Sequence, residues 1–244
     1  MTTVPGALPI RRSALDAVHE RLAARSRTAA QRGWPLAYGD PAAERRVVAE
    51  SVGLAEPGLY DKWVVRGPDA LAACRSFGLE GQPGRVTPAA PGGINVWAIA
   101  DNEVWLVAAA AAPGGLAAAP IDVAPALDHL RAAGAHVTDV SSGWAVLRLA
   151  GPSVHDLLEE LVAVDLAPSL VPDHAIVQLS IAGSRVVLAR RDVDTSPGYV
   201  LLVARDEAQH LWEVLIHIGQ AHGLQPVGAA ALLPAGQATG EEAP

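Results

Sequence analysis

A short pattern that occurs twice is the feature that most constrains the fold. In each copy an apolar, strand-like stretch runs through Gly-Pro into a helical segment, at Val64-Val65-Arg66-Gly67-Pro68-Asp69 and at Leu147-Arg148-Leu149-Ala150-Gly151-Pro152-Ser153. Proline donates no hydrogen bond to a sheet and suits the first turn of a helix, so each Gly-Pro pair marks a strand-to-helix junction. A duplicated fold explains the repeat.

Periodicity of the apolar residues predicts alternating groups of helices and strands. Spacing of three to four residues predicts helices over 13–30, 41–51, 68–77, 123–133, 153–162 and 206–222. Alternation or short apolar runs predict strands over 59–66, 85–89, 94–100, 103–109, 137–140, 144–150, 175–181, 185–191 and 199–204. The turn residues Asp101-Asn102 join two of these strands into a meander.

Composition excludes several classes of protein. The 244 residues are enough for one large domain or two small ones. The net charge of -8 argues against a nucleic-acid partner, since such proteins carry a basic stripe. The single cysteine, Cys74, excludes an internal disulfide.

No apolar run is long enough for a bilayer, and the first ten residues do not resemble an export signal, so we expect no membrane association and a cytoplasmic protein.

Three histidines near the end of the chain raise the question of a metal site. His210 and His217 lie seven residues apart on one face of the last predicted helix, with His222 close by. No acidic pair or i,i+4 histidine pair accompanies them, as a metal site would require. We therefore predict surface or capping histidines and no metal.

Motifs towards both ends of the chain resemble the aminomethyltransferase family, which includes the T-protein of glycine cleavage. The motifs are Gly33-Trp34-Pro35-Leu36-Ala37-Tyr38-Gly39-Asp40, Glu44, Val52-Gly53-Leu54, Lys62, Val65-Arg66-Gly67-Pro68-Asp69-Ala70, Gly198-Tyr199-Val200, Leu211-Trp212-Glu213 and Gly223-Leu224-Gln225-Pro226-Val227-Gly228. The resemblance implies an α+β fold of internally duplicated antiparallel sheets with helices packed on them.

The resemblance also implies a domain organisation. It covers residues 13–230, with halves at about 13–134 and 135–230, and corresponds to the folate-binding region without the family's C-terminal barrel. Residues 1–12 are expected to form an N-terminal arm. Residues 231–244 lack periodicity and are expected to be a disordered tail.

The family's catalytic acid is replaced in this sequence. Where transferases of the family carry an aspartate facing the reacting nitrogen of tetrahydrofolate, this chain reads Gly92-Gly93-Ile94-Asn95-Val96-Trp97. The resemblance puts Asn95 and Trp97 at the reacting centre. A neutral amide cannot act as a base, although it can orient a ligand by hydrogen bonds. Trp97 is a candidate for a pocket wall, as is Trp34 in its turn.

The residues expected to bind folate are also changed. The family's asparagines after the next strand give way to Val107-Ala108-Ala109-Ala110-Ala111, and its pterin-binding glutamate aligns with Ser196. Asp194 is an alternative source of the carboxylate, and solvated turn residues are the other interpretation of Asp192 and Asp194. With Arg190 and Tyr199, these residues form the expected cofactor site.

Three functions fit this pattern. The first is a tetrahydrofolate-binding, aminomethyltransferase-like protein of one-carbon metabolism that transfers a methyl or methylene group from a small amine or ether. The second is a non-catalytic subunit resembling the gamma subunit of heterotetrameric sarcosine oxidase, with a protein partner or a second copy. The third is a pocket repurposed for another small molecule in specialised metabolism. Because the acid is replaced, catalysis is left open.

Overall fold

The computed structural model describes residues 12–22, 35–58, 60–89, 93–108 and 122–232. The helices are α1 (Asp16–Arg21), α2 (Pro41–Glu50), α3 (Ala70–Ser76), α4 (Ala124–Ala132), α5 (Val154–Glu159) and α6 (Ala208–Gly219), followed by the 3-10 helices η1 (Gln220–His222) and η2 (Ala229–Leu232). The strands are β1 (Val52–Ala55), β2 (Lys62–Arg66), β3 (Arg85–Thr87), β4 (Ile94–Ala100), β5 (Glu103–Ala108), β6 (His136–Asp139), β7 (Trp144–Ala150), β8 (Ile176–Ile181), β9 (Ser184–Arg190), β10 (Gly198–Ala204) and β11 (Leu224–Pro226).

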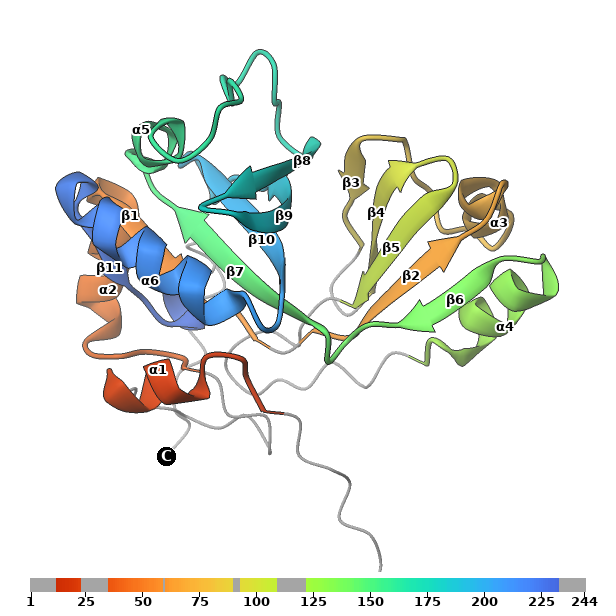
Figure 1. Ribbon diagram of the computed structural model, residues 1–244, viewed down its shortest axis with the longest axis horizontal. Helices are drawn as coiled ribbons and strands as arrows, with labels where there is room; N and C mark the ends of the chain where they lie inside the picture. Colours follow the sequence, from red (N-terminus) through yellow and green to blue (C-terminus); the bar gives the residue numbers. More distant parts are fainter. Residues whose placement is uncertain (1–11, 23–34, 59, 90–92, 109–121, 233–244) are drawn as a thin grey trace, which may run out of the picture.

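The strands form two sheets, and the predicted α+β class is confirmed. A six-stranded sheet has the order β11-β1-β7-β10-β9-β8, and a five-stranded sheet has the order β3-β4-β5-β2-β6. The neighbouring strands are antiparallel except for β1 and β11, which run parallel. Figure 1 shows the sheets facing each other, with α5 and α6 on the outer side of one and α3 and α4 on the outer side of the other.

Three apolar clusters hold these layers together. One fills the space between the six-stranded sheet and α1, α5 and α6, and a second lies between the five-stranded sheet and α3 and α4. The third joins the inner faces of the two sheets, where Trp97 and Trp105 meet Val187 and Leu202. Alternate residues of each strand therefore serve different clusters, as the period of two in a strand requires.

The two sheets do not divide the chain at residue 134. Strand β1 precedes this point but pairs with β7 and β11 in the six-stranded sheet, and β6 follows it but pairs with β2 in the five-stranded sheet. Each half of the chain thus contributes one strand to the sheet formed mainly by the other. The predicted elements did not include β1.

The repeated Gly-Pro pattern occupies matching places in the two sheets. Gly67 follows β2 and leads to α3, while Gly151 follows β7 and leads to α5. Both glycines have positive φ, +155° and +138°, a backbone conformation that residues with a Cβ atom rarely adopt. The pattern therefore marks two equivalent strand-to-helix turns.

Helix α2 is fixed at its start and along its length by carboxylates. Asp40 accepts hydrogen bonds from the first-turn amides of the helix, and Pro41 occupies the first helical position. Glu44, which is buried, accepts three more from the backbone N–H groups of Tyr38, Gly39 and Gly228, each at 2.7 Å. It ties the chain before α2 to the segment that precedes η2.

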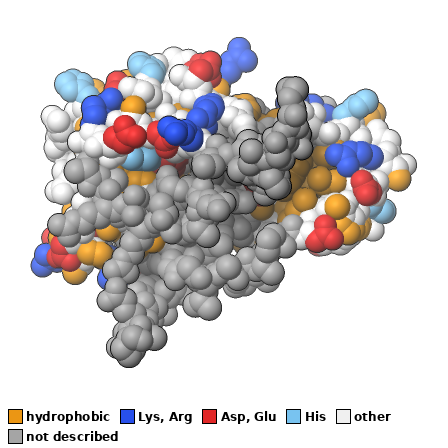
Figure 2. All heavy atoms as spheres, turned by 90° about the horizontal axis from the view of Figure 1, so that it is seen from below, with side chains coloured by type: hydrophobic (Ala, Val, Ile, Leu, Met, Phe, Trp, Pro, Cys, Tyr) orange, Lys and Arg blue, Asp and Glu red, His pale blue; other side chains and the backbone are white. Residues whose placement is uncertain are grey.

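The two ends of the chain fall largely outside the described residues. This applies to residues 1–11 of the predicted arm, to residues 23–30 of the first predicted helix and to residues 233–244 of the predicted tail. Residues 231 and 232 belong to η2. None of the described helices combines the length and apolar character needed to cross a bilayer. On the face seen in Figure 2, basic and acidic side chains lie intermixed over the described surface.

Candidate functional site

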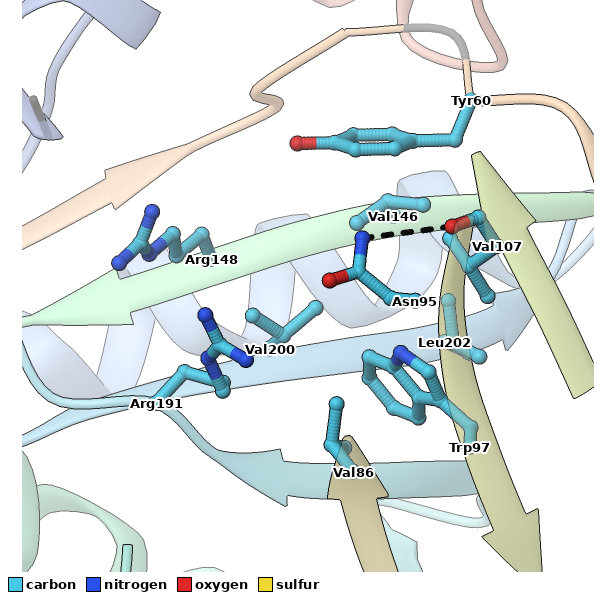
Figure 3. A pocket seen from close by; sticks show the side chains of 10 residues that line it. All are labelled: Tyr60, Val86, Asn95, Trp97, Val107, Val146, Arg148, Arg191, Val200 and Leu202. Carbon is cyan, nitrogen blue, oxygen red and sulfur yellow. Dashed lines mark hydrogen bonds between the residues drawn. The ribbon is translucent and has the colours of Figure 1, made fainter. Parts of the chain in front are cut away.

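A pocket of about 110 Å³ opens where the inner faces of the two sheets meet. Its polar groups are Tyr60, Asn95, Arg148 and Arg191, and its remaining walls are apolar (Figure 3). The apolar lining residues are Val86, Trp97, Val107, Val146, Val200 and Leu202. The pocket is smaller than the roughly 300–1,000 Å³ typical of sites that enclose a drug-sized ligand, so it suits a small molecule or one end of a larger one.

Strand alternation places both arginines on the inner face. On β7, Val146 and Arg148 face the second sheet, and after β9 Arg191 continues the inner row of Val187 and Ala189. Figure 3 shows the two guanidinium groups on the same side of the pocket as the hydroxyl of Tyr60. Two cationic groups and one phenol are thus directed into one half-buried space.

Burial sets the electrostatics of these groups. It lowers the pKa of Arg148, an effect that neighbouring Arg191 reinforces and Asp173 opposes. It also lowers the pKa of Arg191, again against the influence of Asp173. Burial raises the pKa of Tyr60, whereas the two arginines act in the opposite direction. Arginine stays protonated in proteins, so the pocket presents two positive charges and a neutral phenol at neutral pH.

The predicted reacting-centre residues Asn95 and Trp97 both line this pocket. Trp97 is 4% exposed and forms a wall continuous with the cluster between the sheets. The Asn95 side chain is engaged with the backbone, since its Oδ1 accepts from the amide of Ala89 at 3.1 Å and its Nδ2 donates to the carbonyl of Val107 at 3.3 Å. The amide holds the start of β4 in place and keeps one N–H and one lone pair for a ligand.

Two predicted cofactor residues lie on the opposite face of the six-stranded sheet. Arg190 shares the outer row of β9 and binds both carboxylate oxygens of Asp192, at 2.9 and 3.0 Å, and the carbonyl of Val171 at 3.1 Å. Tyr199 is fully buried in the helix-side cluster, with its hydroxyl 3.3 Å from Nε2 of His155. The structure therefore does not bring Arg190 and Tyr199 together with Asn95 and Trp97.

The other two predicted cofactor residues, Asp194 and Ser196, belong to a tight turn before β10. Val193 and Ser196 exchange two backbone hydrogen bonds of 2.9 Å, and Asp194 is exposed with φ of 51°. Neither residue lines the pocket, and their role in folate binding stays a prediction. Trp34, the other candidate aromatic wall, lies outside the described residues.

The histidines considered as metal ligands have other neighbours. His222 lies 2.9 Å from a carboxylate oxygen of Glu160, and His210 lies 3.2 Å from the carbonyl of Ala182. Within the described part of the chain, no three His, Cys, Asp or Glu residues are grouped as a metal ion would need.

The pocket residues that the sequence did not single out are Tyr60, Arg148 and Arg191. Arg148 lies in the second copy of the Gly-Pro pattern, and Arg191 follows Arg190, which the resemblance implied as a cofactor residue. The signal that identifies them is strand parity, because Arg191 is one residue beyond Arg190 and hence on the other face.

Comparison with solved structures defines the class of protein. The fold matches glycine cleavage system aminomethyltransferase T from Bartonella henselae with a TM-score of 0.68 and 19% identity, over 91% of this chain and 61% of that one. It also matches a chain of the heterotetrameric sarcosine oxidase from Corynebacterium sp. U-96 with a TM-score of 0.57 and 22% identity, over 75% of this chain and 92% of that one. The chain therefore has the aminomethyltransferase-type fold.

Sequence comparison identifies the family. Residues 92–234 match the GCVT N-terminal domain, and the chain belongs to this family. It is 31% identical to an aminomethyltransferase of Streptomyces coelicolor over 90% of this chain, and 29% identical to one of Saccharopolyspora erythraea over 89%. In both cases the match spans 60% of the relative's length.

Proposed function

We propose that this chain binds a reduced folate such as tetrahydrofolate, or a flat ligand of similar chemistry, in the pocket between its sheets, and serves one-carbon metabolism. The main support for this proposal is the pocket itself, in which Tyr60 and Trp97 provide aromatic walls and the Asn95 amide lies between them (Figure 3). Aromatic walls suit a planar ring, and an amide suits its polar edge. Membership of the family supports the choice of folate.

The proposed role is binding, with proton transfer left to another group. No described residue that lines the pocket carries a carboxylate. Asn95 cannot exchange a proton at neutral pH, and burial keeps the phenol of Tyr60 protonated. A methyl or methylene transfer at this site therefore requires an acid or base from the donor molecule or from a partner chain.

Isothermal titration under anaerobic conditions tests the proposal. Tetrahydrofolate and 5-formyltetrahydrofolate are titrated into the intact chain and into Trp97→Phe, which shortens one aromatic wall. Trp144→Phe is the matched control, because Trp144 packs edge-to-face on Trp105 and does not line the pocket. We expect micromolar binding that weakens about tenfold in Trp97→Phe, in line with about 1–3 kcal/mol for a stacked ring, and is unchanged in the control. Absence of binding at millimolar ligand contradicts the proposal.

A second candidate function is that of a subunit in an oxidase-like complex. The observation in its favour is the fold, which also matches a chain of the heterotetrameric sarcosine oxidase with a TM-score of 0.57. Affinity purification of the tagged chain from its own cells distinguishes the candidates. Stoichiometric recovery of an oxidase chain supports the subunit role, and recovery of the chain alone contradicts it.

A further inference from the structure

The two arginines of the pocket have no hydrogen-bond partner among the described residues. The Nε atom of Arg148 is buried without a partner, and no hydrogen bond joins the Arg191 guanidinium to another described side chain or backbone group. The neighbouring Arg190 provides the contrast, because Asp192 holds it in a two-oxygen ion pair. Arg190 is thus hydrogen-bonded to a carboxylate, whereas Asp173 acts on the two pocket arginines electrostatically and no hydrogen bond joins it to them among the described residues.

Such an arrangement is costly without a ligand. Two like charges lie in one half-buried space, and burial disfavours a charged group that is not hydrogen-bonded. An anion placed between the guanidinium groups offsets both costs at once. Planar guanidinium groups match the two oxygens of a carboxylate especially well.

The surroundings indicate the charge and size of that anion. Asp173 acts electrostatically on both Arg148 and Arg191 and offsets part of their positive charge, which favours a singly charged anion over a phosphate dianion. Apart from Tyr60 and Asn95 the rest of the lining is apolar, and about 110 Å³ admits only a compact group.

We propose that Arg148 and Arg191 form a carboxylate-binding site, and that the ligand of the pocket presents a monocarboxylate with a short apolar or planar body to them. The inference deepens the proposed function, because it concerns the same pocket. The carboxylate belongs either to a free small acid or to the glutamate end of a folate, and in the second case the planar ring between Tyr60 and Trp97 is the adjoining p-aminobenzoyl ring and the pterin lies outside the pocket. The Tyr60 hydroxyl lies on the same side of the pocket as the two guanidinium groups (Figure 3).

The first test uses small probes and the intact chain. Thermal unfolding is measured with sodium isobutyrate, with isobutyramide as its neutral counterpart, and with sodium phosphate, all at one ionic strength so that screening is constant. A ligand that binds only the folded chain raises its melting temperature in a saturable way. We expect a saturable rise with isobutyrate alone. An equal rise with isobutyramide, or a larger one with phosphate, overturns the inference.

Matched variants assign the response to the two arginines. Arg148→Met and Arg191→Met keep most of the side-chain volume but remove the charge. Arg185→Met is the control, since Arg185 is exposed on β9 and does not line the pocket. We expect Arg148→Met and Arg191→Met to weaken isobutyrate binding at least tenfold, as loss of a charged hydrogen bond does, and to melt no lower than wild type without ligand. Retention of wild-type affinity in both variants overturns the inference.

Folate titrations of the same variants separate this inference from the proposed function. If wild type responds to isobutyrate but does not bind 5-formyltetrahydrofolate, the carboxylate site stands and the folate proposal is wrong. The opposite result has two parts: wild type does not respond to isobutyrate, and Arg148→Met and Arg191→Met bind the folate as tightly as wild type does. In that case the folate proposal stands and the carboxylate site is wrong. A tenfold loss of folate affinity in these variants assigns the carboxylate to the folate.

Discussion

Replacement of Gly151 by alanine is expected to be far more damaging than the same change at Gly67, although both glycines occupy equivalent turns. Both have positive φ, so each alanine is strained by about 1–3 kcal/mol. A Cβ atom on Gly67 has its nearest neighbour at 3.7 Å, the Cα of Ala135. A Cβ atom on Gly151 falls 2.0 Å from the carbonyl oxygen of Ser51, which belongs to the backbone and cannot rotate away.

The extra clash sets the expected difference between the two variants. Overpacking costs about 1–3 kcal/mol or more, so Gly151→Ala is expected to lose about 2–6 kcal/mol in total and Gly67→Ala about 1–3 kcal/mol. For a chain of this size each kcal/mol lowers the melting temperature by roughly 2–4 °C. Urea unfolding followed by tryptophan fluorescence gives both free energies. Equal losses in the two variants, or a greater loss for Gly67→Ala, refute the reasoning.

Three further predictions concern buried groups away from the pocket. Glu44→Ala removes an acceptor of three backbone hydrogen bonds and is expected to lower the free energy of unfolding, measured in urea, by about 2–4 kcal/mol. Glu50 is exposed on the same helix, and Glu50→Ala is expected to leave this free energy nearly unchanged. Burial raises the pKa of the Cys74 thiol to about 11, so a thiol reagent at pH 8 is expected to label it only at the rate of unfolding; faster labelling contradicts its burial. Burial raises the pKa of Tyr199 to about 12, so the folded state favours the neutral phenol. The stabilising contribution of this phenol is complete below pH 10 and is lost between about pH 10 and 12. Tyr199→Phe is expected to remove this loss from the pH dependence of the free energy of unfolding, measured in urea.

Much of the fold was predictable from local patterns. The Gly-Pro pairs gave the positions of two strand-to-helix turns, and Gly67 and Gly151 explain why, since both need a positive φ. Strand β1 was missed because its four residues are all buried and show no alternation. Its pairing with β7 and β11 joins segments about 90 and 170 residues away, and a local pattern carries no information about such partners.

The site was predictable only in part, for a geometric reason. The resemblance placed both Asn95 and Trp97 at the reacting centre, and because they are two residues apart on β4 their side chains lie on the same face of the sheet. Arg190 and Arg191 are adjacent, and a motif alignment does not state which of them faces the second sheet. The structure resolves this, since Arg191 lines the pocket and Arg190 pairs with Asp192 on the other face.

The charge of the pocket also constrains its chemistry. Small amine donors are cations near neutral pH, and the positive charges of Arg148 and Arg191 repel a cation in a half-buried space much more strongly than they would in water. No described residue that lines the pocket carries a carboxylate, which would attract such a donor. The missing carboxylate and the two arginines thus act in the same direction, against an amine and in favour of an anion. An amine that binds this pocket more tightly than its matching acid would contradict this account.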